Sequence, residues 1–149
     1  MLKAKDIMTK QVITVAPDTP VKEVAKTLWE HRINGVPVVD ENGDIVGIVT
    51  EADLIDQNKK IHIPTAIFFL DSLIFLENPK KLDQEIKKMV GTTAADVCTK
   101  KVITVDEDTP VEEIATIMAE KRINTIPVTK NGKLVGIIGR GDVIRAMAA

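Results

Sequence analysis

The chain contains one segment twice. Residues 6–38 match residues 96–128 at 19 of 33 positions without a gap, and residues 42–55 match residues 131–144 at 7 of 14 positions. A repeat of this length is a whole supersecondary unit, and two such units in one small chain are expected to bury their apolar faces against each other. Any binding site is therefore expected between the two copies.

The composition is that of an ordinary globular domain. The chain has 149 residues, of which 44% are apolar and 28% charged, and this is enough for a buried core. The net charge of −2 does not give the basic surface that phosphate-backbone binding requires, so nucleic-acid binding is not expected. Cys98 is the single cysteine, which excludes an intramolecular disulfide framework and a cysteine-rich metal site and indicates a reducing compartment.

No segment is predicted to enter a membrane. Residues 1–9 lack the apolar run of a secretory signal. Residues 66–76 form the most apolar stretch, but Asp71 and Ser72 interrupt it, and it falls short of the ~20 apolar residues that span a bilayer. We therefore expect a cytoplasmic protein without membrane association.

Each copy is predicted to begin with a strand and a helix. In the first copy, the β-branched residues 12–15 favour a strand, and Thr19 is the predicted N-cap of a helix with Pro20 at its first position. In the second copy, Thr109 and Glu112 are predicted to form a capping box. Apolar residues then recur at helical spacing in both copies, which indicates one buried helix face in each.

The second half of each copy is predicted to be a hairpin followed by another helix. Asn-Gly dipeptides at residues 42–43 and 131–132 favour tight turns between two strands. The predicted order is therefore β-α-β-β-α in each copy. Small sheets with helices on one side, packed through their open faces, make a mixed α/β fold of the α+β type.

Four motifs occur in both copies and together resemble a known family. They are Ile-Thr-Val, Asp-Thr-Pro-Val, Arg-Ile-Asn-x-x-Pro-Val and Asn-Gly-x-x-Val-Gly-Ile, and the copies end in Thr-Glu-Ala-Asp at residues 50–53 and Gly-Arg-Gly-Asp at residues 139–142. This set resembles a tandem pair of CBS domains, an arrangement called a Bateman module. The resemblance implies one CBS repeat at residues 1–56 and a second at residues 93–149, related by pseudo-twofold symmetry, with a helical insert at residues 57–92.

The resemblance also implies a function. CBS pairs hold two clefts between the repeats, and these clefts commonly bind AMP, ADP, ATP or S-adenosylmethionine as regulatory ligands. The chain is therefore expected to be a stand-alone sensor of an adenosine-containing ligand that acts on an effector protein, with no catalytic cofactor. The alternative is a ligand-free module for oligomerisation or protein interaction.

The residues themselves suggest how such a cleft would bind. A carboxylate accepts hydrogen bonds from ribose hydroxyls, and a helix N-terminus offers free N–H groups to phosphate, so Asp53 and Asp142 are the candidate ribose ligands, with Thr50 adding a hydroxyl in the first cleft. The resemblance implies that the opposite repeat completes each cleft. The full candidate set is Thr50, Asp53, Lys101, Ile103, Ile123 and Asn124 for one cleft, and Gln11, Ile13, Ile33, Asn34, Gly139, Arg140 and Asp142 for the other.

Several of these residues have a simpler interpretation. Thr50 and Asp53 are also what a helix N-terminus favours, with the threonine as cap and the aspartate beside the positive end of the dipole. In the second copy Gly139 replaces the threonine while the aspartate remains, which favours a ligand there. Arg32 and Arg122 are candidate phosphate contacts, as is Lys133, but both arginines also suit the C-terminal ends of the preceding helices; Arg140 is a further candidate phosphate contact.

The two clefts are expected to be unequal. Glu51 would repel a polyphosphate beside Asp53, whereas Arg140 would attract one beside Asp142. The Asp53 cleft is therefore predicted to prefer a ligand of low charge, and the Asp142 cleft to tolerate phosphates better.

The insert suggests a partner surface. All three phenylalanines lie within residues 57–92, among more apolar residues than one flank of a small module can cover. A homodimer that buries part of this segment is expected, the alternative being that the insert only covers its own core.

An enzyme is not expected. His31 and His62 have no acid, cysteine or serine arrangement near them in the sequence, and neither a glycine-rich phosphate loop nor metal-ligand spacing occurs.

Overall fold

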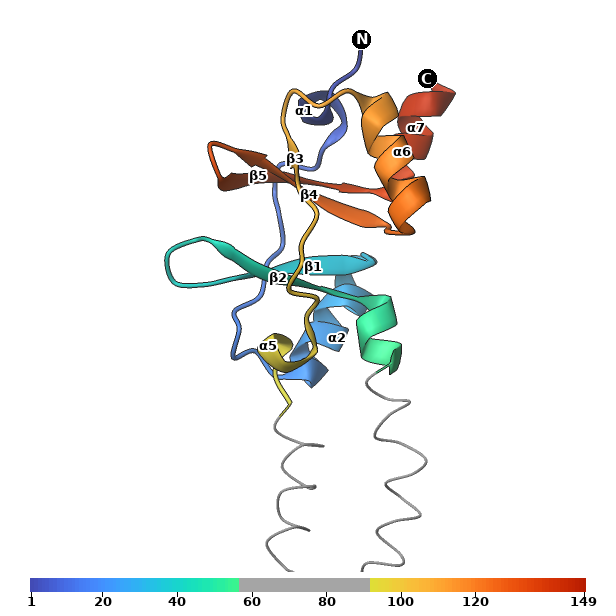
Figure 1. Cartoon of the computed structure of the whole chain (residues 1–149). Coiled ribbons are helices and arrows are strands. Elements are labelled where there is room, and N and C mark those ends of the chain that lie inside the picture. The colour runs from blue at the N-terminus through green and yellow to red at the C-terminus, as the bar shows by residue number, and fades with distance from the viewer. Residues whose placement is uncertain (57–91) are drawn as a thin grey trace, which may run out of the picture.

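The computed structural model of the chain describes residues 1–56 and 92–149 (Figure 1). The predictions for the insert fall on residues outside these ranges. The first element is helix α1 (Ala4–Ile7). The first repeat continues with α2 (Val21–His31), β1 (Gly35–Val39), β2 (Ile45–Thr50) and a helix at residues 51–56, and the second has α5 (Ala94–Val97), β3 (Val105–Asp106), α6 (Val111–Lys121), β4 (Thr125–Lys130), β5 (Lys133–Gly139) and α7 (Arg140–Ala148). The predicted mixed α/β fold is confirmed.

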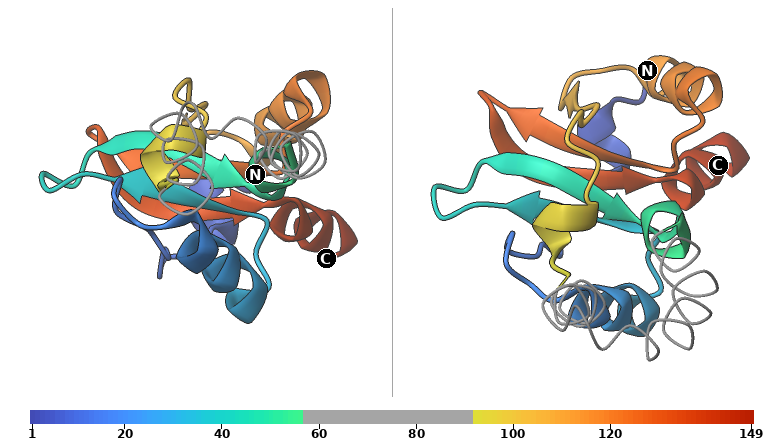
Figure 2. Two further views of the ribbon diagram at one scale, coloured as in Figure 1. Left: turned by 90° about the horizontal axis from the view of Figure 1, so that it is seen from below. Right: turned by 60° about the horizontal axis from the view of Figure 1, so that its bottom comes forward.

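Two small sheets lie at the centre of the molecule. β1 pairs with β2 and β4 pairs with β5, both antiparallel, and β3 joins β4 in parallel. The predicted hairpin turns are present, with φ of +82° at Gly43 and +79° at Gly132, a backbone region that glycine enters without steric cost. Figure 2 shows the two hairpins lying against each other, with α2 and α5 beyond one and α6 and α1 beyond the other.

The strand predicted at residues 12–15 is largely wrong. Only Val15 pairs, through a single parallel bridge to Val38 in which Val39 N donates to Val15 O at 2.9 Å. The matching segment of the second copy forms β3, which is two residues long. These segments meet the sheet edge briefly, so their β-branched side chains serve the core more than a ladder.

The predicted helix caps are also wrong. The N-cap positions belong to Pro20 and Pro110, and neither helix start has a side-chain cap. The first free N–H of each helix is instead met by a backbone carbonyl of a distant segment: Val21 N donates to Thr92 O at 3.0 Å, and Val111 N donates to Leu2 O at 3.1 Å. With these amides satisfied, neither the threonine nor the glutamate of the predicted capping box is needed there.

Those distant segments are two short arms that the repeats exchange. The first arm, residues 1–9, packs on the second repeat, where Ala4 N donates to Thr109 O at 2.8 Å and Thr9 pairs with Ile137. The second arm, residues 92–99, packs on the first repeat in the same way. Figure 1 shows α1 beside α6 and α7, and α5 beside α2. The arm that precedes the first repeat in sequence therefore packs on the second repeat, and the arm that precedes the second repeat packs on the first.

Each arm closely approaches a glycine of the repeat on which it packs. A Cβ on Gly47 would lie 2.5 Å from Cys98 Sγ, and a Cβ on Gly136 would lie 2.3 Å from Met8 Sδ. The sulfur side chain of each arm thus occupies the space of a missing side chain in a strand. Burial raises the pKa of the Cys98 thiol, so this cysteine stays protonated and inert at neutral pH.

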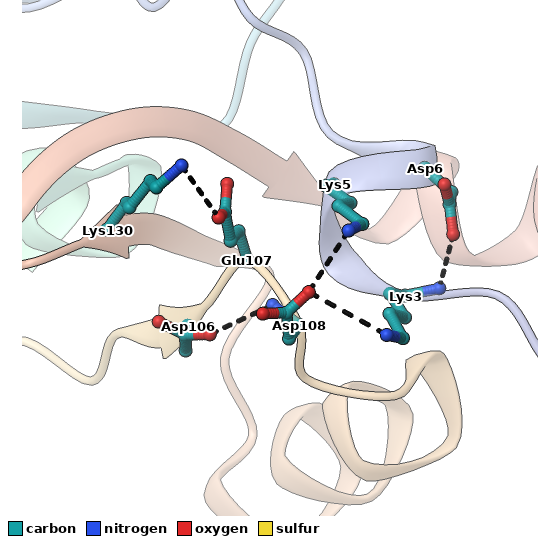
Figure 3. A network of polar contacts seen from close by, with 7 residues as sticks. All are labelled: Lys3, Lys5, Asp6, Asp106, Glu107, Asp108 and Lys130. Atoms are coloured by element: carbon teal, nitrogen blue, oxygen red, sulfur yellow. Dashed lines mark hydrogen bonds and ion pairs between the residues drawn. The ribbon is translucent and has the colours of Figure 1, made fainter.

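The first arm also carries an ion-pair network that the second lacks (Figure 3). Lys5 lies 3.2 Å and Lys3 lies 3.8 Å from Asp108, and Lys130 lies 3.3 Å from Glu107. The hydrogen bond from Lys5 lowers the pKa of the Asp108 carboxyl and raises that of the lysine. The matching positions in the second arm are threonine and alanine, so the equivalent pairs cannot form there.

Each repeat has its own core, and an exchanged alanine is fully buried in both. Ala94 lies in the first core with Val24, Val36, Val38 and Val49. The second core contains Ala4, Ile114, Ile126, Val128 and Ile138. The two sheets meet where a Cβ on Gly35 of β1 would lie 3.1 Å from Thr125 Oγ1 of β4.

Candidate functional site

A cavity of about 350 Å³ lies between the repeats. It is walled by the end of β2 and the helix after it, by the segment that leaves the second arm, and by the turn between α6 and β4. The lining residues are Asn34, Ile48, Thr50, Glu51, Ala52, Ile55, Thr99, Lys101, Val102, Ile103, Arg122, Ile123, Asn124 and Thr125. Neither repeat forms this wall alone, because each contributes one side of it.

Five of the six residues predicted for the first cleft line this one cavity. They are Thr50, Lys101, Ile103, Ile123 and Asn124. The two isoleucines are half-buried and belong to the second repeat or the segment before it. The structure thus brings an apolar slot, two cations and a hydroxyl together within one cavity.

Asp53 does not line the cavity but lies behind two residues that do. Its Oδ2 accepts hydrogen bonds from Thr50 N at 2.9 Å and from Thr50 Oγ1 at 3.1 Å. Its Oδ1 accepts one from Thr99 Oγ1 at 3.1 Å. The carboxylate therefore fixes the direction of two threonine hydroxyls. Thr50 Oγ1 also accepts Asp53 N at 3.4 Å, and each hydroxyl still has a lone pair with which it can accept a further hydrogen bond.

The contact between Asp53 and the helix start is not unique to the cavity. Asp6, Asp96 and Asp142 also sit three residues after an N-cap and accept its backbone N–H through Oδ2, each at 2.8 Å. The helix-capping interpretation therefore accounts for part of the role of all four aspartates. What distinguishes Asp53 is the bond from Thr99, which comes from the exchanged arm.

The two Arg-Ile-Asn motifs have backbone roles. Arg32 and Arg122 end α2 and α6 in the left-handed conformation, with φ of 53° and 55°. Two residues later, Asn34 O accepts Glu51 N at 2.9 Å, and Asn124 O accepts Arg140 N at 3.0 Å. The backbone of both arginines therefore agrees with the helix-end interpretation. Arg122 also lines the cavity.

The residues predicted for the second cleft are placed differently. Asn34 lines the same cavity as the residues predicted for the first cleft. Ile13 and Ile33 pack against the first core, and Gln11 is exposed. Gly139 is the N-cap of α7, whose first residue is Arg140.

Asp142 has a partner that Asp53 does not have within the part of the chain that the structure describes. Its Oδ1 accepts a hydrogen bond from the Arg145 guanidinium, one turn further along α7. Lys133, by contrast, is not near this helix start: it begins β5 while Gly139 ends it, and its ammonium lies 3.5 Å from Asp44 of the other hairpin. The structure therefore does not support Lys133 as a phosphate contact beside Asp142.

Some cavity residues were not predicted from the sequence. Thr99 is the clearest, because it both lines the cavity and donates to Asp53. Ile48 pairs with it through two backbone hydrogen bonds of 2.8 and 3.0 Å. The repeat offered one signal, since Thr9 stands at the matching position of the first arm.

The fold and the cavity define a paired module in which two α/β repeats share one binding space. The CBS domain model matches residues 4–59 and again residues 94–149, so the chain belongs to the CBS domain family as a tandem pair. The resemblance noted from the motifs is confirmed.

Relatives and solved structures agree with this assignment. The Bacillus subtilis protein YlbB is 33% identical over 144 residues, which cover 96% of this chain and 80% of YlbB. The structure of CBSX2 in complex with AMP has a TM-score of 0.76 at 28% identity and covers 99% of this chain and 97% of CBSX2. The CBS pair of MJ0100, in complex with 5′-methylthioadenosine and S-adenosyl-L-methionine, has a TM-score of 0.72 at 29% identity, with 99% and 97% covered.

Within residues 1–56 and 92–149, no helix is long and apolar enough to span a bilayer. The same ranges hold no group of three or more histidine, cysteine or acidic side chains arranged to bind a metal ion.

Proposed function

We propose that this chain is a regulatory sensor that binds an adenosine-containing ligand in the cavity between its repeats. The observation that carries the proposal is the convergence of Thr50, Thr99, Lys101 and Ile123 from both repeats and one exchanged arm on a single space of about 350 Å³. That volume is within the range of small-molecule sites, roughly 300 to 1,000 Å³. Two similar CBS pairs were solved with AMP or with adenosyl sulfur compounds.

The lining suggests how the parts of such a ligand would be held. Ile103 and Ile123 offer apolar surface to an adenine ring. The hydroxyls of Thr50 and Thr99, directed by Asp53, offer acceptor lone pairs to the ribose hydroxyls. Binding of this kind needs no change in the carboxylate, because the threonines already hold it.

The charges of the cavity suit a ligand with little net charge. Lys101 and Arg122 line it together with Glu51, and Asp53 lies directly behind, so two cations face two anions. We propose that this cleft takes an uncharged adenosine, a monophosphate or an adenosyl sulfonium in preference to a polyphosphate. By the symmetry of the repeat, the second cleft is proposed at Gln11, Ile13, Ile33, Gly139, Arg140 and Asp142.

The test is a ligand panel. Purified protein is melted with AMP, ADP, ATP, S-adenosylmethionine and 5′-methylthioadenosine, and affinities are measured by calorimetry. A ligand present at about 100 times its dissociation constant adds about 2.7 kcal/mol of stability, which is a clear rise in the melting temperature. No rise with any of the five compounds would end the proposal.

A second candidate function is an interaction module without a small ligand. Exposed apolar side chains favour it, among them Trp29 at 84% and Met147 at 76% exposed. We propose that these belong to a homodimer or effector surface in either case. Sedimentation velocity with and without AMP separates the two functions: a dimer that forms while the ligand panel stays silent would favour the interaction module.

A further inference from the structure

The two repeats hold their matching aspartates in different ways. Asp142 Oδ2 accepts Gly139 N at 2.8 Å, as expected of a helix start, but its Oδ1 accepts from the Arg145 guanidinium. The side chain of Asp142 is only 14% exposed, whereas that of Arg145 is 75% exposed. The arginine therefore lies over the solvent side of a largely buried carboxylate.

Among the described residues, Asp53 of the first repeat has no such contact. The position that matches Arg145 is Asp56, an acid that cannot donate to a carboxylate at neutral pH. Asp53 is held by the hydroxyls of Thr50 and Thr99 instead. In the second repeat a glycine replaces that first threonine, so no hydroxyl is available at the helix start.

This difference determines which groups can accept a hydrogen bond from a ribose hydroxyl in each cleft. A threonine that donates to a carboxylate still has lone pairs, so at the first cleft the ribose can donate to Thr50 or Thr99 without breaking a bond. A guanidinium has only donors and no acceptor. At the second cleft Oδ1 of Asp142 already accepts from the guanidinium, so a ribose hydroxyl that donates to this oxygen competes with a charge-assisted hydrogen bond.

We propose that Arg145 is a specificity-determining residue, because it occupies the ribose-accepting oxygen of Asp142 and thereby directs a ribose ligand to the Asp53 cleft. The inference rests on the proposed function. The two clefts then differ in their affinity for a ribose ligand because of one side chain of α7. The wild-type chain is predicted to bind one equivalent of adenosine more tightly than a second.

The test uses adenosine, which carries no phosphate, so that loss of a positive charge does not itself weaken binding. Adenosine is titrated calorimetrically into Asp53→Ala, in which the first cleft is impaired, and into the double variants Asp53→Ala with Arg145→Ala or Lys121→Ala. Lys121 is the control, since it is an exposed cation at the end of α6 and is not among the residues proposed for either cleft. Melting curves establish that each variant is folded.

Removal of Arg145 is expected to tighten adenosine binding at the second cleft by about fivefold, the upper end for an exposed ion pair, because Asp142 is largely buried. The Lys121 control is expected to change it less than about twofold. Unchanged affinity after loss of Arg145, or an equal gain in the control, would overturn the inference. If the wild-type chain binds neither adenosine nor AMP, the proposed function itself fails, and the wild-type titration shows this separately.

Discussion

The role of Asp53 can be separated from its role as a helix cap, because the chain contains the same cap elsewhere. Asp96 accepts Thr93 N at 2.8 Å and Thr93 Oγ1 at 3.0 Å, and Asp53 accepts the same two groups of Thr50 at 2.9 and 3.1 Å. Among the described residues, only Asp53 also receives the hydroxyl of Thr99 beside the cavity. Asp53→Ala and Asp96→Ala therefore form a matched pair.

Both substitutions should cost similar stability. Loss of a capping contact costs about 0.5 to 2 kcal/mol. For a chain of this size each kcal/mol lowers the melting temperature by roughly 2 to 4 °C, so both variants should melt a few degrees below the wild type. Differential scanning fluorimetry measures this directly.

The affinities should differ. Hydrogen bonds to a charged group contribute about 1.5 to 3 kcal/mol, so releasing the two hydroxyls that Asp53 directs should weaken AMP binding roughly 10- to 100-fold. Asp96→Ala should bind AMP like the wild type. Calorimetric titration of the three proteins gives the comparison. Equal affinity of both variants, or equal losses in both, would refute the assignment of Asp53 to the ligand site and leave it as a cap alone.

Two further predictions concern the arms. Asp108→Asn should lower the melting temperature at neutral pH but not well below the ordinary carboxyl pKa of 3.8, because Lys5 lowers the pKa of Asp108 and the stabilisation is lost as pH falls through that lowered value. Asp18→Asn, the matching change in the other repeat, should do less at any pH, and an equal effect would contradict the ion-pair argument. Gly47→Ala should destabilise the protein by about 1 to 3 kcal/mol, because its Cβ would lie 2.5 Å from the sulfur of Cys98. Gly141→Ala should stabilise it, because nothing lies within 4 Å of its Cβ and glycine is unfavourable in a helix. Urea unfolding checks both variants, and an unchanged stability of Gly47→Ala would show that the arm is loosely packed.

The sequence predicted the fold because the relevant signals are local or repeated. The Asn-Gly turns need glycine at positive φ, and the apolar spacing of α2 and α6 identifies one buried face in each. Of the five predicted residues that line the cavity, Thr50 came from the chemistry of a helix start, and the other four came from the match to family motifs. None of these signals depends on how the two repeats are connected.

The parts that the sequence did not predict depend on long-range partners. Thr19 has the chemistry of an N-cap, yet the helix amide at Val21 is met by the carbonyl of Thr92, which propensity cannot anticipate. Thr99 shows the same limit, because its hydroxyl bonds Asp53 across 46 residues of sequence. The exchange of arms produces both contacts, and it becomes visible only when the two repeats are placed together.

The arm exchange also bears on how a ligand would change the molecule. Thr99 belongs to the arm that completes the first core, and it is tied to Ile48 by two backbone hydrogen bonds and to Asp53 by its hydroxyl. Ile123 and Asn124, on the opposite wall, belong to the second repeat. A ligand that contacts both walls therefore binds the assembled pair better than the separated repeats, and by linkage it must stabilise their association and the docking of the arm by the same free energy. Hydrogen exchange of the amides of Thr99 and Ile48, slowed by AMP in the wild type but not in Asp53→Ala, is the expected signature; equal protection in both proteins would place the stabilisation elsewhere.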